Sequence, residues 1–166
     1  GRNDDSTPRY DAEPVMTAGA VAAAAGFLLG VLWMDLMFDS QARSGADALD
    51  EKALASIAGY YHRATTTSAP RGLLIAATMV ALLVLIAVDA ATGGRTGWPL
   101  AASMALAGGP ILLAVLHTVP AATRLGRRTD TPEIQSRLAR AVYRDHRICL
   151  TAMSAFLALW LLTGLN

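Results

Sequence analysis

Charged side chains are scarce in this sequence, and they carry almost no excess of either sign. Only 16% of the 166 residues are charged and 54% are hydrophobic, whereas a soluble domain has about 25% charged residues. The formal net charge is +1, so a nucleic-acid-binding protein with a broad basic surface is not expected. This composition is typical of a membrane protein.

Cysteine is nearly absent as well. The sequence has one cysteine, Cys149, which excludes a disulfide within the chain and a cysteine-rich metal site. It also excludes thiol oxidoreduction through a pair of cysteines of this sequence. We expect Cys149 to pack as a small apolar residue.

The dominant feature is a set of four long apolar runs. A helix needs about 20 apolar residues to cross the hydrocarbon core, and backbone polar groups in lipid must bond within their own segment. The sequence therefore predicts an all-α integral membrane protein, in which residues 15–166 form a single four-helix transmembrane bundle. A flexible polar tail, residues 1–14, precedes it, and this acidic stretch does not resemble a secretory signal. The predicted spans are residues 15–38, 72–91, 98–119 and 142–165, with the last helix beginning earlier, near Glu133.

The basic residues are distributed unevenly between the two ends of this bundle. Of the 14 Lys and Arg residues, nine lie in the connections after the first and third spans, two more, Arg144 and Arg147, lie at the start of the fourth span, and only three lie elsewhere. The positive-inside rule predicts that both connections are cytoplasmic. Both termini then lie on the non-cytoplasmic side of the cell membrane.

Both long connections carry helical patterns. Within residues 46–65, apolar side chains recur at helical spacing. In the second connection, Thr131 and Pro132 are typical of a helix N-cap and first position. We expect short amphipathic helices in the two cytoplasmic connections, as helix extensions at the membrane surface.

Small residues recur every four positions in two spans. They make close helix contacts possible in lipid, either inside the bundle, which we favour because four helices must first find partners, or at the face of a dimer. The Gly108-Gly109-Pro110 sequence predicts a kink in the third span, which either opens a cavity or adjusts the packing. The small residues are Ala18, Ala22, Gly26 and Gly30 in the first span, and Ala101, Ala105 and Gly109 in the third.

Asp35 is the most informative polar residue. An ionised carboxylate inside a span costs about 2.5–3.5 kcal/mol on insertion scales, so it usually faces a partner or a water-filled cavity. Its candidate partners are His117, His146 and the arginines of the second long connection. Either these groups form a structural ion pair, or Asp35, His117 and His146 are reactive, and we take these three as candidate catalytic residues.

Other residues at the same membrane level are candidates for a binding pocket. Asp39 shares a helix face with Asp35, and Tyr143 and Trp33 supply aromatic surface nearby. Two carboxylates and three imidazoles could hold a divalent metal or iron, but no spacing such as His-x-x-x-His supports this. We therefore assign no metal ligands, and the sequence indicates no cofactor.

The second half of the chain resembles the anthrone-oxygenase-like family of small four-helix membrane proteins. The likeness rests on the segments VPAATRL at residues 119–125 and RAVYRDHR at residues 140–147. The family pattern carries over onto Pro120, Tyr143, His146 and Arg147. Asparagines common in the family are replaced here by other residues. The resemblance implies a four-helix bundle with oxidoreductase-like activity on an aromatic molecule.

Two functions are compatible with these patterns. One is an enzyme-like membrane protein whose polar pocket, open to the cytoplasm, receives a hydrophobic aromatic or quinone-like molecule. The other is a non-catalytic accessory subunit of a larger membrane complex, or a homo-oligomer, held by helix contacts in the lipid bilayer. Neither inverted repeats nor paired broken helices, which are typical of transporters, are evident.

Overall fold

The computed structural model describes residues 12–43, 48–67 and 69–164, and every regular element in these ranges is helical. The predicted all-α class is therefore confirmed for this part of the chain. The predicted tail, residues 1–14, lies mostly outside the described residues, and helix α1 already begins at Ala12. The elements are α1 (Ala12–Asp39), η1 (Ser40–Arg43), α2 (Glu51–His62), η2 (Arg63–Thr67), α3 (Ala69–Ala91), α4 (Gly97–Leu113), η3 (Ala114–Thr118), α5 (Val119–Arg127) and α6 (Pro132–Thr163).

Four helical segments of the described chain are long and apolar enough to cross a membrane. All four overlap the predicted spans. The third is longer than predicted because α5 continues α4. The fourth includes the basic segment before residue 142, which confirms the predicted helix start near Glu133. They cover Met16–Arg43, Pro70–Ala91, Gly97–Arg127 and Pro132–Thr163.

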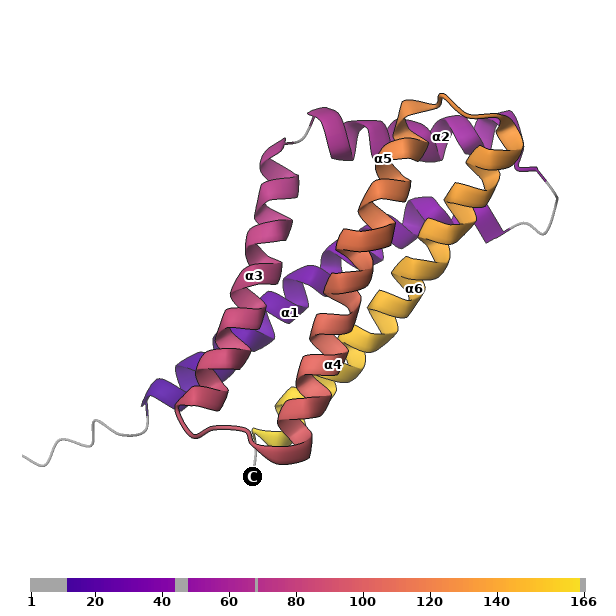
Figure 1. Ribbon diagram of the computed structural model, residues 1–166. Coiled ribbons are helices and arrows are strands. Elements are labelled where there is room, and N and C mark those ends of the chain that lie inside the picture. Colours follow the sequence, from indigo (N-terminus) through magenta and orange to yellow (C-terminus); the bar gives the residue numbers. More distant parts are fainter. Residues whose placement is uncertain (1–11, 44–47, 68, 165–166) are drawn as a thin grey trace, which may run out of the picture.

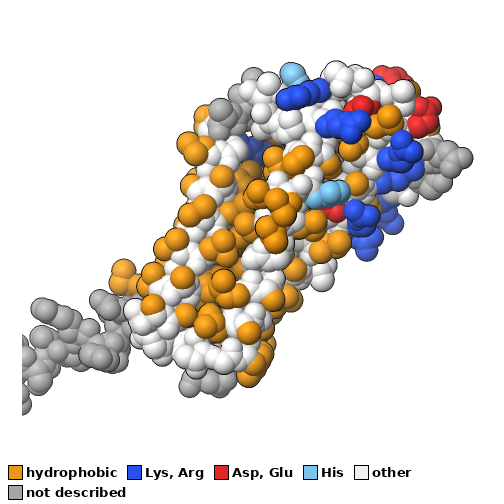
Figure 2. Space-filling view, in the orientation of Figure 1, with side chains coloured by type: hydrophobic (Ala, Val, Ile, Leu, Met, Phe, Trp, Pro, Cys, Tyr) orange, Lys and Arg blue, Asp and Glu red, His pale blue; other side chains and the backbone are white. Residues whose placement is uncertain are grey.

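The long helices run between two ends that differ in composition. Figure 1 shows the start of α1, the end of α6 and the short turn between α3 and α4 at one end, and α2 lying across the other. On the face shown in Figure 2, Lys, Arg, Asp and Glu gather at the end that carries α2, while the shafts of the helices are largely apolar. We call this the charged end.

The interior holds two hydrophobic clusters, one above the other. The shaft cluster joins residues of α1, α3, α4 and α6, including Leu28, Ile86 and Phe156. The second cluster lies at the charged end, where α2 packs on α5 and α6 through residues such as Ile57 and Leu125. The amphipathic helix predicted in the first connection is thus confirmed as α2, and its apolar face is covered by protein.

In the second long connection, the predicted helix extension is part of α6, which begins at Pro132, close to the predicted start near Glu133. The helical path continues from α4 through η3 into α5, and α6 is one unbroken helix from Pro132 to Thr163. Only residues 128–131 turn the chain, with Arg128 in the left-handed conformation at φ 51°. Thr131 is the N-cap of α6 and Pro132 its first residue, as predicted, and α5 and α6 form a helical hairpin.

The helical path is irregular just after the predicted kink. Helix α4 continues through Pro110, and the wide π-helical turn η3 follows it, in which the N–H of Val119 bonds to the carbonyl of Ala114. Pro120 comes next. A proline lacks an N–H and its ring crowds the carbonyl four residues earlier, which accounts for a widened turn at this point.

The two glycines of the small-residue stripe of α1 face outward, while Ala18 and Ala22 are half-buried. Gly26 and Gly30 are exposed, and a Cβ added at either would meet no atom within 4 Å. The favoured prediction of packing inside the bundle is therefore wrong for these glycines. The opposite stripe faces inward instead, because it carries the carboxylates that must avoid lipid. That inward stripe comprises Val21, Ala25, Leu28, Leu32, Asp35 and Asp39.

Candidate functional site

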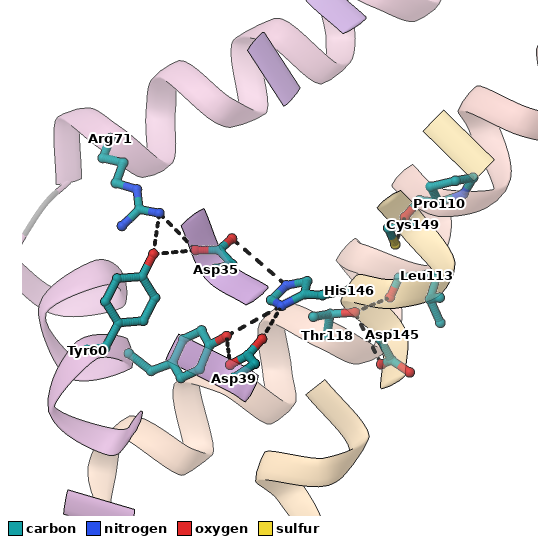
Figure 3. A network of polar contacts seen from close by, with 11 residues as sticks. Asp35, Asp39, Tyr60, Arg71, Pro110, Leu113, Thr118, Asp145, His146 and Cys149 are labelled. Atoms are coloured by element: carbon teal, nitrogen blue, oxygen red, sulfur yellow. Dashed lines mark hydrogen bonds and ion pairs between the residues drawn. The ribbon is translucent and has the colours of Figure 1, made fainter. Parts of the chain in front are cut away.

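His146 lies at the centre of a buried polar network between the two hydrophobic clusters (Figure 3). Its Nδ1 atom is 2.6 Å from Oδ2 of Asp39, and Asp39 is fully buried. The hydroxyl of Tyr61 donates to the other oxygen of Asp39 at 2.7 Å. Both carboxylate oxygens therefore have partners, as a buried charge requires. A carboxylate on Nδ1 orients the imidazole and leaves Nε2 as the outward nitrogen.

Asp35 forms the second half of the network, one helical turn before Asp39. Its Oδ1 accepts hydrogen bonds from the hydroxyl of Tyr60 and from Arg71 at 2.9 Å. Arg71 also donates to the Tyr60 hydroxyl at 2.6 Å. The Nε2 atom of His146 lies 4.0 Å from Oδ2 of Asp35. The imidazole is thus held between two carboxylates, one of which is neutralised by a guanidinium group.

Four helices, α1, α2, α3 and α6, contribute these groups. The spacing of four residues places Asp35 and Asp39 on one face of α1, at its charged end. Tyr60 and Tyr61 end the amphipathic helix α2, whose packing on α5 directs them toward α1. Gly126 of α5 allows this contact, because a Cβ at that position would lie 2.8 Å from the backbone nitrogen of His62.

A cavity of about 150 Å³ opens beside His146. Its walls are mostly apolar and come from α1, α3, the α4–α5 path and α6, with side chains such as Leu32, Ile75 and Met153. Its polar lining residues come from α1, α2, η2, α3, η3 and α6. The polar lining residues are Asp35, Tyr61, Thr65, Arg71, Thr118 and His146.

The two tyrosines of α2 remain hydroxyl donors over a wide pH range. Burial, together with the hydrogen bond to Asp35 and the charge of that carboxylate, raises the pKa of Tyr60 to about 12. Burial and then the neighbouring Asp39 carboxylate raise the pKa of Tyr61 even further. An ionised phenolate beside a carboxylate would place two like charges in contact. The tyrosines therefore stabilise the carboxylates as neutral donors.

His117 belongs to a separate polar cluster on the other side of α6. Its Nδ1 atom bonds to Oδ2 of Asp145, which also accepts from the Thr118 hydroxyl at 3.2 Å, while Arg144 lies 3.3 Å from the other carboxylate oxygen. The predicted pairing of Asp35 with His117 is therefore wrong. Consecutive residues of a helix point in different directions, so Asp145 faces His117 while His146 faces Asp39.

None of the three predicted pocket residues, Asp39, Tyr143 and Trp33, is among the residues that line the cavity. Trp33 is 62% exposed, since it lies on the outer face of α1, and Tyr143 packs beneath the guanidinium of Arg147. Asp35, Asp39 and His146 do come together. The arginine that joins them is Arg71, from the start of α3, and not one from the second long connection as predicted.

Sequence reasoning missed five members of the two clusters. The two tyrosines could have been identified from the sequence, because they stand on the apolar face of an amphipathic helix that precedes the second span. Arg71 could have been identified as well, because it is the basic residue directly before an otherwise uncharged span. The missed residues are Tyr60, Tyr61, Arg71, Thr118 and Asp145.

No metal centre is formed by the part of the chain that the structure describes. In these ranges, no three His, Cys, Asp or Glu side chains are grouped so that they could hold a metal ion. The three histidines are dispersed, since His62 is exposed on α2 and His117 and His146 face different partners. What the network can do chemically is accept, donate or hold a proton and bind a polar group.

Comparison with known proteins adds no assignment. No family model, curated protein or solved structure matches this chain. The resemblance to the anthrone-oxygenase-like family therefore stays a prediction.

Proposed function

We propose that this protein binds a hydrophobic aromatic or quinone-like molecule in the cavity beside His146, and that His146 exchanges a proton with the polar group of that molecule. One observation carries this proposal. Asp39 engages Nδ1 of His146 at 2.6 Å, while the same imidazole lines a largely apolar cavity. A histidine oriented by a carboxylate at one nitrogen is the arrangement that general acid–base catalysis uses.

The size and lining of the cavity support a ring-shaped ligand. An apolar cavity of roughly 150 Å³ accommodates one benzene-sized ring, and binding pockets are typically apolar with a few polar groups that fix orientation. Here Arg71 and His146 are among the few polar lining residues, so a ring with a hydroxyl or carbonyl would place that oxygen near them. The resemblance to a family named for an aromatic ketone substrate is compatible with such a ligand.

The membrane orientation belongs to the same proposal. Both long connections are taken as cytoplasmic and both termini as non-cytoplasmic, because most Lys and Arg residues lie at the charged end. The cavity then lies at the cytoplasmic level of the cell membrane. A hydrophobic molecule dissolved in the bilayer would reach it without crossing the polar surface.

The test is to purify the protein in a mild detergent and to identify co-purifying molecules by mass spectrometry and absorption spectrum. His146→Gln should lose the molecule or shift its spectrum. His117→Gln is the matched control, since it makes the same chemical change at a histidine that does not line the cavity, and it should retain the molecule. Equal retention by both variants would contradict the proposal.

A second function is favoured by the outward face of α1. Gly26 and Gly30 expose backbone along the helix, as small residues do where two membrane helices meet, which fits an accessory subunit or a homo-oligomer. In that case Gly26→Leu should release the protein from its assembly, while Asp35→Asn should be nearly silent. In the enzyme-like case, Asp35→Asn should abolish turnover and Gly26→Leu should not.

A further inference from the structure

A second recess lies on the outer face of α6, and it shares no residue with the cavity beside His146. It is an open groove of about 650 Å³ that runs along α6 and is flanked by Leu106 of α4. Basic side chains line one end and apolar or small side chains line the other. The residues of α6 in the groove are Tyr143, Arg144, Arg147, Ile148, Thr151, Ala152 and Ala155.

The polarity of this groove matches a phospholipid. Arg144 and Arg147 are three residues apart and lie on one helix face, and the side chain of Arg144 is 66% exposed. The guanidinium of Arg147 stands 5.7 Å from the centre of the Tyr143 ring, an arrangement that positions the charge above the groove. Guanidinium groups bind phosphate in bidentate fashion, so the basic end is suited to an anionic headgroup.

The length of the groove also matches the thickness of one leaflet of the bilayer. Ala155 follows Arg144 by 11 residues, which is a rise of roughly 16 Å along an α-helix. One leaflet of the hydrocarbon core is roughly 15 Å thick. Ala152 and Ala155 leave space where larger side chains would fill the groove. A headgroup at the arginines therefore has room for an acyl chain beneath it, through the depth of one leaflet.

We infer that this groove is a binding site for one anionic phospholipid, with its phosphate on Arg144 and Arg147 and one acyl chain along Ile148, Ala152 and Ala155. The occupant is a lipid and not a soluble phosphate, because the apolar part of the groove contributes only to a ligand that carries a chain. The site is independent of the proposed function, since the groove and the cavity lie on different faces of α6.

The experiment measures lipid retention by native mass spectrometry of the protein in a neutral detergent. Phosphatidylglycerol and phosphatidylcholine are added in equal amounts, and phosphatidylglycerol should be preferred. The variant Arg144→Gln/Arg147→Gln should bind phosphatidylglycerol roughly 30-fold more weakly, at about fivefold per arginine near the membrane surface. The matched control Arg127→Gln/Arg137→Gln removes two exposed charges outside the groove and should change binding less than twofold.

Two further measurements distinguish a specific lipid site from general electrostatic attraction of anionic lipids to the protein. Ala155→Phe fills the apolar part while keeping both arginines, and it should weaken phosphatidylglycerol binding. Glycerol phosphate at the same concentration should not displace the lipid. The proposal is overturned by equal binding of the two lipids, by equal losses in the two double variants, by an unaffected Ala155→Phe protein, or by displacement with glycerol phosphate.

Discussion

His146 and Asp39 are separated by 107 positions in the chain, and Nδ1 of the histidine lies 2.6 Å from Oδ2 of the aspartate. This contact joins the first and last long helices at the charged end. Because Asp39 is fully buried, its carboxylate has no water as a substitute partner. The pair therefore holds α1 against α6 and orients the imidazole in the same interaction.

Loss of this pair should destabilise the fold. Asp39→Leu leaves His146 and the Tyr61 hydroxyl without their buried acceptor, and breaking a buried pair from one side costs about 3–5 kcal/mol. Thermal unfolding in detergent measures the change. Glu51→Gln is the control, because the bond of Glu51 to Arg128 is exposed and such surface pairs contribute about 0–1 kcal/mol. Equal effects would show that the Asp39 pair is not buried in the folded protein.

Gly126 should be intolerant of a single methyl group. A Cβ there would lie 2.8 Å from the backbone nitrogen of His62, so Gly126→Ala must push α2 away from α5. We expect a loss of about 1–3 kcal/mol, typical of overpacking, and a changed near-ultraviolet circular dichroism signal from the tyrosines. Gly26→Ala is the control. It meets no atom within 4 Å and should be neutral or stabilise the helix by up to about 1 kcal/mol. A Gly126→Ala protein as stable as the wild type would contradict the α2–α5 contact.

Tyr60 should ionise at an unusually high pH. Its pKa in the folded protein is about 12, compared with about 10 in an unfolded chain. The folded state therefore binds this proton more tightly. The resulting stabilisation is complete below pH 10 and is lost as the pH rises toward 12. Ultraviolet titration of tyrosinate should show an ionisation near pH 12 that Tyr60→Phe removes and Tyr143→Phe retains. Persistence of that step in Tyr60→Phe would refute the assignment.

The proposed orientation can be measured with single cysteines. Buried Cys149 is first replaced by alanine, and Thr129→Cys or Thr96→Cys is then introduced at exposed turns of the two opposite ends. In intact cells, a membrane-impermeant thiol reagent should label position 96 and should label position 129 only after permeabilisation. Labelling of both positions in intact cells would rule out the four-crossing topology, and the reverse pattern would invert the orientation.

Part of the site was predictable because its causes are local. An aspartate inside an apolar run must find a partner wherever the helix packs, which identified Asp35 without a structure. The helical spacing of four likewise placed Asp39 on the same face. The predicted pairing of Asp35 with His117 was wrong for a physical reason. Residues at one membrane level still face different directions around each helix axis.

The sequence by itself determined the four apolar helices, their approximate ends and the concentration of basic residues at one end, because hydrophobic length and helix periodicity depend only on neighbouring residues. The tertiary structure alone decided how each helix is rotated about its axis. That rotation turned the glycine stripe of α1 outward and directed Asp35 toward Arg71 and Tyr60. It also placed His117 beside Asp145 and His146 beside Asp39. Rotation depends on the packing of all the helices together, since the most favourable arrangement must bury the charged groups in pairs and fill the shaft at the same time.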